Sequence, residues 1–123
     1  MKAAKINVEK KTIELVEITD DYRSYYPHLS PHCSLFTCGF TLSHNEGIFV
    51  DDEGLLNGTA ELGGFAIDTE DGIFPFVGNG LIIGCDEEGE SIDIDFRKVC
   101  SELSGKLFWL TPQQTMKMAE EFV

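Results

Sequence analysis

The chain has 123 residues, the length of one ordinary domain, and 42% of them are hydrophobic. At this size a fold buries roughly two-thirds of the surface that its unfolded chain exposes, so a stable core can form without disulfide bonds or structural metal ions. The formal net charge is −13, from nine Lys and Arg against 22 Asp and Glu, which makes nucleic acid and anionic membranes poor direct partners.

The charge is concentrated in residues 24–96, which we call the acidic middle segment. This segment contains no Lys or Arg and carries 14 acidic residues, whereas the two flanking segments are nearly neutral. Such a field attracts basic protein surfaces, including those that grip phosphates. The alternative interpretation is that the charge serves solubility or adaptation to a salty cytoplasm.

The N-terminal residues 2–11, KAAKINVEKK, are too polar for the apolar centre of a signal peptide. The uncharged run at 72–85 is shorter than the ~20 residues that a membrane-spanning helix needs. We therefore predict a cytoplasmic protein with reduced, unpaired and buried cysteines, because disulfides are rare in that compartment. The cysteines are Cys33, Cys38, Cys85 and Cys100.

The first predicted elements are strands at 2–8 and 12–18, joined by a turn into a hairpin, because apolar residues alternate in both. A short helix is predicted to follow at 19–26. Its expected cap is Asp20, and Pro27 is expected to end it.

Period-two alternation predicts the next strand at 33–43 and its hairpin partner at 48–50. One face of the first strand is expected to pack into the core through four side chains, which are Phe36, Cys38, Phe40 and Leu42. Residues 55–63 are predicted to be a loop or a brief helical turn. Strands are then predicted at 63–68, 73–77 and 80–85, and Pro75 should place its strand at a sheet edge or a bulge.

Helical spacing of apolar residues predicts an amphipathic helix at 93–103, ended by Gly105. Its buried face is expected to consist of Phe96, Val99, Cys100 and Leu103. A strand at 106–110 should follow, and then a helix that starts with a capping box formed by Thr111 and Gln114. The sequence predicts a single α+β domain (1–123), with an antiparallel or mixed sheet and two to three short helices.

Three short acidic stretches resemble one another: DDEG at 51–54, TEDG at 69–72 and DEEG at 86–89. Asp and Gly favour turns, so all three are explained as turns between strands. A calcium loop of the EF-hand type is not indicated. The acids at 51–53 are adjacent rather than alternating, and the twelfth residue from Asp51 is Leu62 instead of Glu.

The motifs FVDDEGLL (49–56) and GNGLIIGCDEEGES (78–91) resemble those of a family of small proteins of unknown function, found in phages, plasmids and other mobile elements. The stretches INVEKKTIELVEI, DYRSYY and GGFAI occur in the matching order, so the resemblance covers roughly residues 1–95. It implies a genomic setting, and it implies no catalytic residues.

Other chemical sites find little support in the sequence. His28, His32, Cys33 and Cys38 are zinc-ligand types, and the spacing of the two histidines fits a structural zinc site. However, Cys33 adjoins His32, and Cys38 is expected to point into the core, so a zinc site is not indicated. The glycines at 78–84 lead into a strand and an acidic turn, so a phosphate-binding loop is not indicated. No nucleophile motif is present. A small-molecule pocket lined by Tyr22, Tyr25, Tyr26 and Trp109 is less common than core packing by such residues.

The favoured hypothesis is an accessory protein of a mobile element that binds a basic protein surface, as a nucleic-acid mimic or an anti-defence inhibitor, for instance of a CRISPR effector. We expect it to have no enzymatic activity, no cofactor and no metal. The expected partner-binding residues are Asp51, Asp52, Glu53, Glu70, Asp71, Asp86, Glu87, Glu88 and Glu90. If the protein mimics nucleic acid, these clusters should share one surface. The alternative is a protein that sequesters a small ligand such as a nucleotide, using cations from Lys5, Arg23, Arg97 and Lys98.

Overall fold

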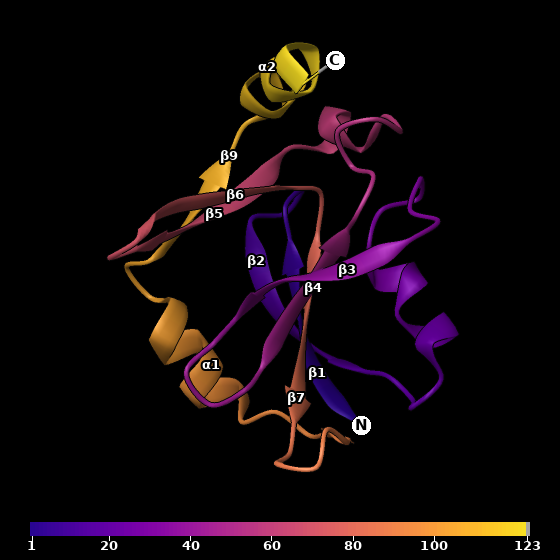
Figure 1. Cartoon of the computed structure of the whole chain (residues 1–123), viewed down its shortest axis with the longest axis vertical. Coiled ribbons are helices and arrows are strands. Elements are labelled where there is room, and N and C mark those ends of the chain that lie inside the picture. The colour runs from indigo at the N-terminus through magenta and orange to yellow at the C-terminus, as the bar shows by residue number, and fades with distance from the viewer. Residues whose placement is uncertain (123) are drawn as a thin grey trace.

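The computed structural model describes residues 1–122, and their strands form two antiparallel sheets (Figure 1). The first sheet has the strand order β2-β1-β7-β4-β3, and the short β8 pairs with the end of β7. Its strands are β1 (Lys2–Asn7), β2 (Thr12–Glu17), β3 (Phe36–Thr41), β4 (Gly47–Asp51), β7 (Gly80–Cys85) and β8 (Ser91–Ile92). The second sheet has the order β6-β5-β9, with β5 (Gly64–Thr69), β6 (Gly72–Val77) and β9 (Leu107–Leu110).

Two α-helices and three short 3-10 turns complete the described residues. They are η1 (Tyr22–Ser24), η2 (Tyr26–His28), η3 (Thr59–Leu62), α1 (Phe96–Leu103) and α2 (Pro112–Phe122). The predicted α+β fold class is confirmed, and the sheets are antiparallel rather than mixed. Across residues 1–122 no helix has the length and apolar character to span a membrane.

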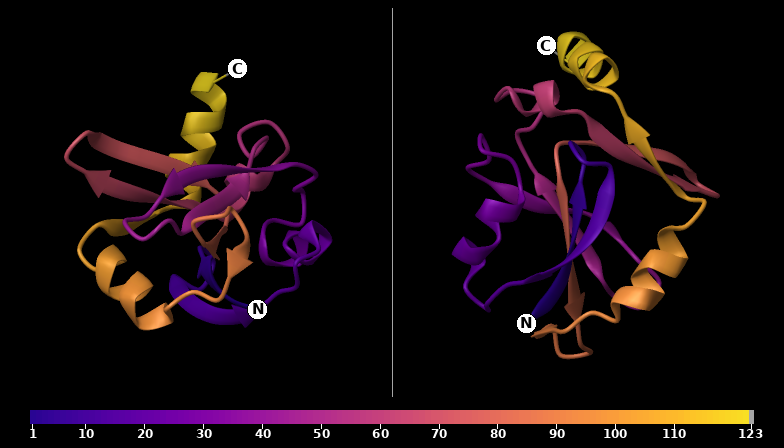
Figure 2. Two further views of the ribbon diagram at one scale, coloured as in Figure 1. Left: turned by 60° about the horizontal axis from the view of Figure 1, so that its bottom comes forward. Right: turned by 180° about the vertical axis from the view of Figure 1, so that it is seen from behind.

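The larger core lies between the first sheet on one side and the second sheet with α1 on the other (Figure 2). Its buried side chains are Ala4, Ile6, Val8, Leu42, Ile48, Val50, Phe65, Ile67, Ile82, Ile94, Val99 and Leu103. Successive residues of a strand point to opposite faces, so Ile82 enters this core while Leu81 and Ile83 face the other way. Both faces of the central strand β7 are therefore buried, one in this core and the other in a second, smaller core.

The smaller core covers the opposite face of the first sheet, where η1 and η2 pack (Figure 2). Tyr25 is buried there, with its ring centroid 5.4 Å from that of Phe36 and 6.2 Å from that of Phe49. These centroid distances fall within the usual range for interacting aromatic pairs. Tyr25 is therefore used for packing, whereas Tyr22 on η1 is exposed.

A β-bulge in β3 corrects the predicted core face of that strand. The pairing of β3 with β4 shifts by one residue between Cys38 and Phe40, which leaves Gly39 as the extra residue. Because the bulge turns the strand over, Phe36 packs in the smaller core and Phe40 packs against the larger one. Cys38, expected in the core, is exposed. The strand also begins later than predicted, at Phe36.

The short helix predicted at 19–26 is also corrected. Two consecutive 3-10 turns occupy this region, and Pro27 lies inside the second turn instead of ending a helix. The cap is Asp21 and not Asp20, since the Asp21 side chain accepts a hydrogen bond of 2.9 Å from the backbone N–H of Arg23. A proline near the start of a helical turn is tolerated because its missing N–H has no partner there.

The helix predicted at 93–103 begins three residues later, at Phe96, because Asp95 caps it. The predicted capping box is confirmed, since Thr111 and Gln114 exchange side-chain-to-backbone hydrogen bonds of 3.2 and 2.8 Å. Cys100 of α1 is half-buried, while Val99 and Leu103 are buried. Pro75 lies on β6, an edge strand of the second sheet, as expected for a residue without an N–H.

Candidate functional site

The three acidic turns do not meet at one end of a sheet. Strands β4 and β7 are antiparallel neighbours, so residues 51–53, which end β4, and residues 86–90, which follow β7, lie at opposite ends of the first sheet (Figure 1). Residues 70–71 lie at the tip of the β5–β6 hairpin, in the second sheet. For a nucleic-acid mimic we expected the three acidic turns to lie at the same end of one sheet. The structure does not have this arrangement.

Asp51 is buried, so it is not available at the surface as the sequence hypothesis required. Its carboxylate accepts hydrogen bonds from the Asn57 side-chain amide at 2.8 Å and from the Thr59 hydroxyl at 2.9 Å. It also accepts one from the backbone N–H of Glu53 at 3.0 Å, and the Ser30 hydroxyl lies 2.7 Å from that of Thr59. Buried carboxylates need such partners, and here they fix the loop that follows β4.

Asp86 also has a structural role, but a local one. Its carboxylate accepts hydrogen bonds of 2.9 Å from the backbone N–H groups of Glu88 and Glu90, within its own turn. The other seven acids expected to bind a partner are exposed, and they are Asp52, Glu53, Glu70, Asp71, Glu87, Glu88 and Glu90. Charge at these seven positions is accessible to other molecules.

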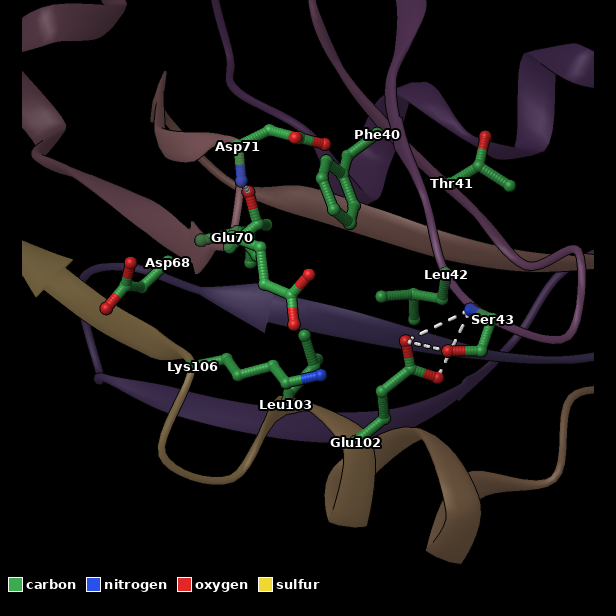
Figure 3. A pocket seen from close by; sticks show the side chains of 12 residues that line it. Phe40, Thr41, Leu42, Ser43, Asp68, Glu70, Asp71, Glu102, Leu103 and Lys106 are labelled. Atoms are coloured by element: carbon green, nitrogen blue, oxygen red, sulfur yellow. Dashed lines mark hydrogen bonds between the residues drawn. The ribbon is translucent and has the colours of Figure 1, made fainter.

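Glu70 and Asp71 line a groove of about 650 Å³, which we call the acidic groove (Figure 3). It lies between the β5–β6 hairpin, the end of β3 with the residues that follow it, and the C-terminal part of α1. The buried side chains of Leu42, Ile67 and Leu103 form its bottom. Its volume lies within the ~300–1,000 Å³ that is common for ligand sites.

Four carboxylates and one ammonium group line the acidic groove. The acids are Asp68, Glu70 and Asp71 from the hairpin and Glu102 from α1, and the cation is Lys106. In Figure 3 the carboxylates of Glu70 and Glu102 and the ammonium of Lys106 turn toward the centre, whereas Asp68 lies at the edge. Converging carboxylates above an apolar bottom can hold a cationic group whose stem is apolar, because both parts of such a group are then matched.

The position of Glu102 is fixed by the loop that follows β3. Its carboxylate accepts hydrogen bonds from the backbone N–H of Ser43 at 3.0 Å and from the Ser43 hydroxyl at 2.8 Å. Sequence reasoning did not select Glu102 or Asp68 as site residues. Nothing local distinguishes Glu102 from any acid on an exposed helix face, because its partners lie 59 residues away.

The cysteines are all free thiols, and they differ in environment. Cys33 is half-buried, and burial together with the nearby Asp51 carboxylate raises the pKa of its thiol to about 11. Burial also raises the pKa of the Cys100 thiol. Within residues 1–122, no three His, Cys, Asp or Glu side chains are grouped so that they could hold a metal ion.

The cations expected to bind a small anionic ligand are distributed over separate elements. Lys5 is on β1, Arg23 on η1, and Arg97 and Lys98 on α1. The Arg23 guanidinium lies 2.8 Å from the carboxylate of Asp21, and this pairing raises the pKa of Arg23. None of these four residues lines the acidic groove.

Comparison with protein-family models, curated proteins and solved structures finds no match for this chain.

Proposed function

We propose that this protein is a non-catalytic binding protein, and that a basic side chain of a partner protein enters the acidic groove. The observation that carries the proposal is a groove lined by four acids and one cation, in which the carboxylates of Glu70 and Glu102 turn toward the centre above an apolar bottom (Figure 3). A Lys or Arg side chain has an apolar stem and a charged end, so it matches both parts of the groove.

The charge of the rest of the molecule supports the same kind of partner. The net charge of −13 attracts basic surfaces over a distance and repels anionic ones, so encounter with a cationic partner is accelerated. A nucleotide or another anion would meet four carboxylates in the acidic groove, which disfavours sequestration of an anionic small ligand there.

The motif resemblance to proteins of mobile elements favours a partner from the host or from the element itself. Inhibition of a host defence protein is a role that such binding would serve in that setting. We propose recognition through a groove rather than imitation of a phosphate array, because the acids at 51–53 and 86–90 lie at opposite ends of the first sheet.

The proposal is tested by neutralising the acidic groove and comparing the variant with a matched control. The groove variant carries Glu70→Gln, Asp71→Asn and Glu102→Gln. The control variant carries Glu87→Gln, Glu88→Gln and Glu90→Gln, which removes the same charge at exposed positions outside the groove. The partner captured from host lysate by the wild-type protein is purified, and its affinity is measured for all three proteins at low and high salt.

We expect the groove variant to bind the partner at least about tenfold more weakly and the control variant to bind nearly as the wild type does. Equal losses in the two variants would indicate that only the net charge matters. Loss in the control variant alone would place the contact at the turn after β7 and would contradict the acidic groove.

A further inference from the structure

A second hollow, which we call the apolar groove, lies between the loop after β4, the edge strand β6 and the helix α2. Its apolar lining includes Leu55, Leu56, Pro75, Val77, Met118 and Phe122. Figure 1 shows α2 at the top of the molecule, next to the loop that precedes η3. The hollow is therefore built by three segments that are distant in the sequence.

Helix α2 is fixed at its beginning and leaves apolar surface open at its end. Thr115 is fully buried, and its hydroxyl donates a hydrogen bond of 2.6 Å to the carbonyl of Ala60 in η3. One and two turns later the same helical stripe carries Met118 and Phe122. Phe122 lines the apolar groove and is nevertheless 60% exposed, so the helix does not close over it.

The opposite wall is a loop that side-chain hydrogen bonds hold in place, and it carries an exposed leucine. The buried Asp51 holds the loop through Asn57 and Thr59, and a Cβ placed on Gly54 would lie 3.3 Å from the Cβ of Val77, so the loop backbone packs against β6. The next side chains line the groove, and Leu56 is 62% exposed. A wall that is ordered in advance lowers the entropy cost of binding.

The size of the apolar groove limits what can occupy it. Its volume is about 210 Å³, below the ~300–1,000 Å³ of small-molecule sites, so it fits one or two inserted side chains better than a whole ligand. The charged residues of its lining are all acids, and the exposed ones are Asp52 and Glu53. A second copy of this chain would bring the same acids and be repelled, whereas a basic segment is matched in charge.

We propose that the apolar groove binds apolar side chains of a partner segment in which Lys or Arg residues flank them. This inference rests on the proposed function, because it concerns the same class of basic partner. The carboxylates steer the encounter and weaken in salt, while the buried apolar side chains supply the part of the affinity that salt does not remove. Leu56 and Phe122 are the two contacts on which this anchor depends.

The test uses two synthetic peptides with equal numbers of lysines. One carries leucines at helical spacing, and the other carries serines at the same positions. Their affinities are measured by calorimetry at low and high salt for three proteins. These are the wild type, an apolar-groove variant with Leu56→Gln and Phe122→Gln, and an apolar control variant with Leu15→Gln and Tyr22→Gln. The control replaces a leucine and an aromatic residue of similar exposure on β2 and η1. Circular dichroism verifies that all variants fold.

We expect the wild type and the control variant to prefer the leucine peptide by about tenfold or more, which is the effect of burying one large apolar side chain. The apolar-groove variant should lose this preference and keep the salt dependence of the wild type. If the apolar-groove variant retains the preference, or if the wild type binds both lysine peptides equally, the apolar groove does not bind the apolar side chains of the partner. The proposed function stands in either case. If neither peptide binds the wild type at low salt, the proposed function fails as well.

Discussion

The two turns DDEG at 51–54 and DEEG at 86–89 are nearly alike in sequence, but the structure uses them differently. The first aspartate of each turn accepts hydrogen bonds from the backbone that follows it. Asp51 is in addition buried and hydrogen-bonded to Thr59 and Asn57, whereas Asp86 is half-buried and hydrogen-bonded within its own turn. The comparison teaches that local sequence sets the turn, and that neighbouring segments decide whether its carboxylate becomes part of the interior.

The largest difference between the two turns should appear when each aspartate is replaced by alanine. Asp51→Ala removes from the interior an acceptor that the Asn57 amide, the Thr59 hydroxyl and the backbone N–H of Glu53 share, so we expect a loss of about 2 to 3 kcal/mol in the free energy of unfolding. Asp86→Ala removes hydrogen bonds in a half-exposed turn and should cost about 1 kcal/mol. Urea denaturation of both variants measures the difference, and equal losses would show that the Asp51 network adds nothing beyond a local turn.

A comparable difference is expected for two glycines with similar backbone conformation. Gly78 (φ +81°) lies against the Thr59 side chain, and Gly89 (φ +84°) belongs to the turn after β7. A Cβ on Gly78 would lie 2.5 Å from Cγ2 of Thr59, while a Cβ on Gly89 meets nothing within 4 Å. Gly89→Ala should therefore cost only the backbone strain, about 1 kcal/mol, and Gly78→Ala about 2 to 3 kcal/mol.

The same denaturation measurement distinguishes these two variants. If Gly78→Ala is as mild as Gly89→Ala, then the Thr59 side chain can move aside, and the region around Asp51 is less tightly packed than the distances indicate.

The smallest effect concerns thiol chemistry and leaves the fold intact. Burial and the Asp51 carboxylate raise the pKa of Cys33 to about 11, so at pH 8 only about one molecule in a thousand carries the reactive thiolate. We expect iodoacetamide to modify the exposed Cys38 first. The rate at Cys33 should rise about tenfold per pH unit until the pH approaches its pKa. Mass spectrometry of the alkylated peptides gives both rates, and modification of Cys33 as fast as Cys38 at pH 8 would contradict a shielded thiol beside Asp51.

Elements with local signals could be predicted from the sequence. The first hairpin, the helix predicted at 93–103 (observed at 96–103) and the capping box of Thr111 and Gln114 each depend on residues within a few positions of one another. Pro75 was predicted correctly at an edge because proline lacks the N–H that an inner strand must donate.

Features that depend on distant segments could not be predicted. The apolar residues of β3 alternate regularly in the sequence, so the pattern does not indicate a bulge. Gly39 is the only local residue that favours one. The burial of Asp51 depends on Ser30 and Thr59, which lie on different segments. Of the acidic groove, the sequence indicated Glu70 and Asp71, while the contribution of Glu102 from α1 emerges only in three dimensions.

The outer strands of both sheets have a consequence for how any partner can attach. The bulge interrupts the edge strand β3, Pro75 removes a donor from β6, β9 has only four residues, and β2 carries Glu14 and Glu17. Each of these features hinders the addition of a further strand to the sheet. Recognition by strand addition, in which backbone hydrogen bonds supply the affinity, is therefore disfavoured at these four edge strands. A partner must therefore bind to the side chains of this protein. Substitution of single side chains is accordingly expected to reveal which of them contribute to binding.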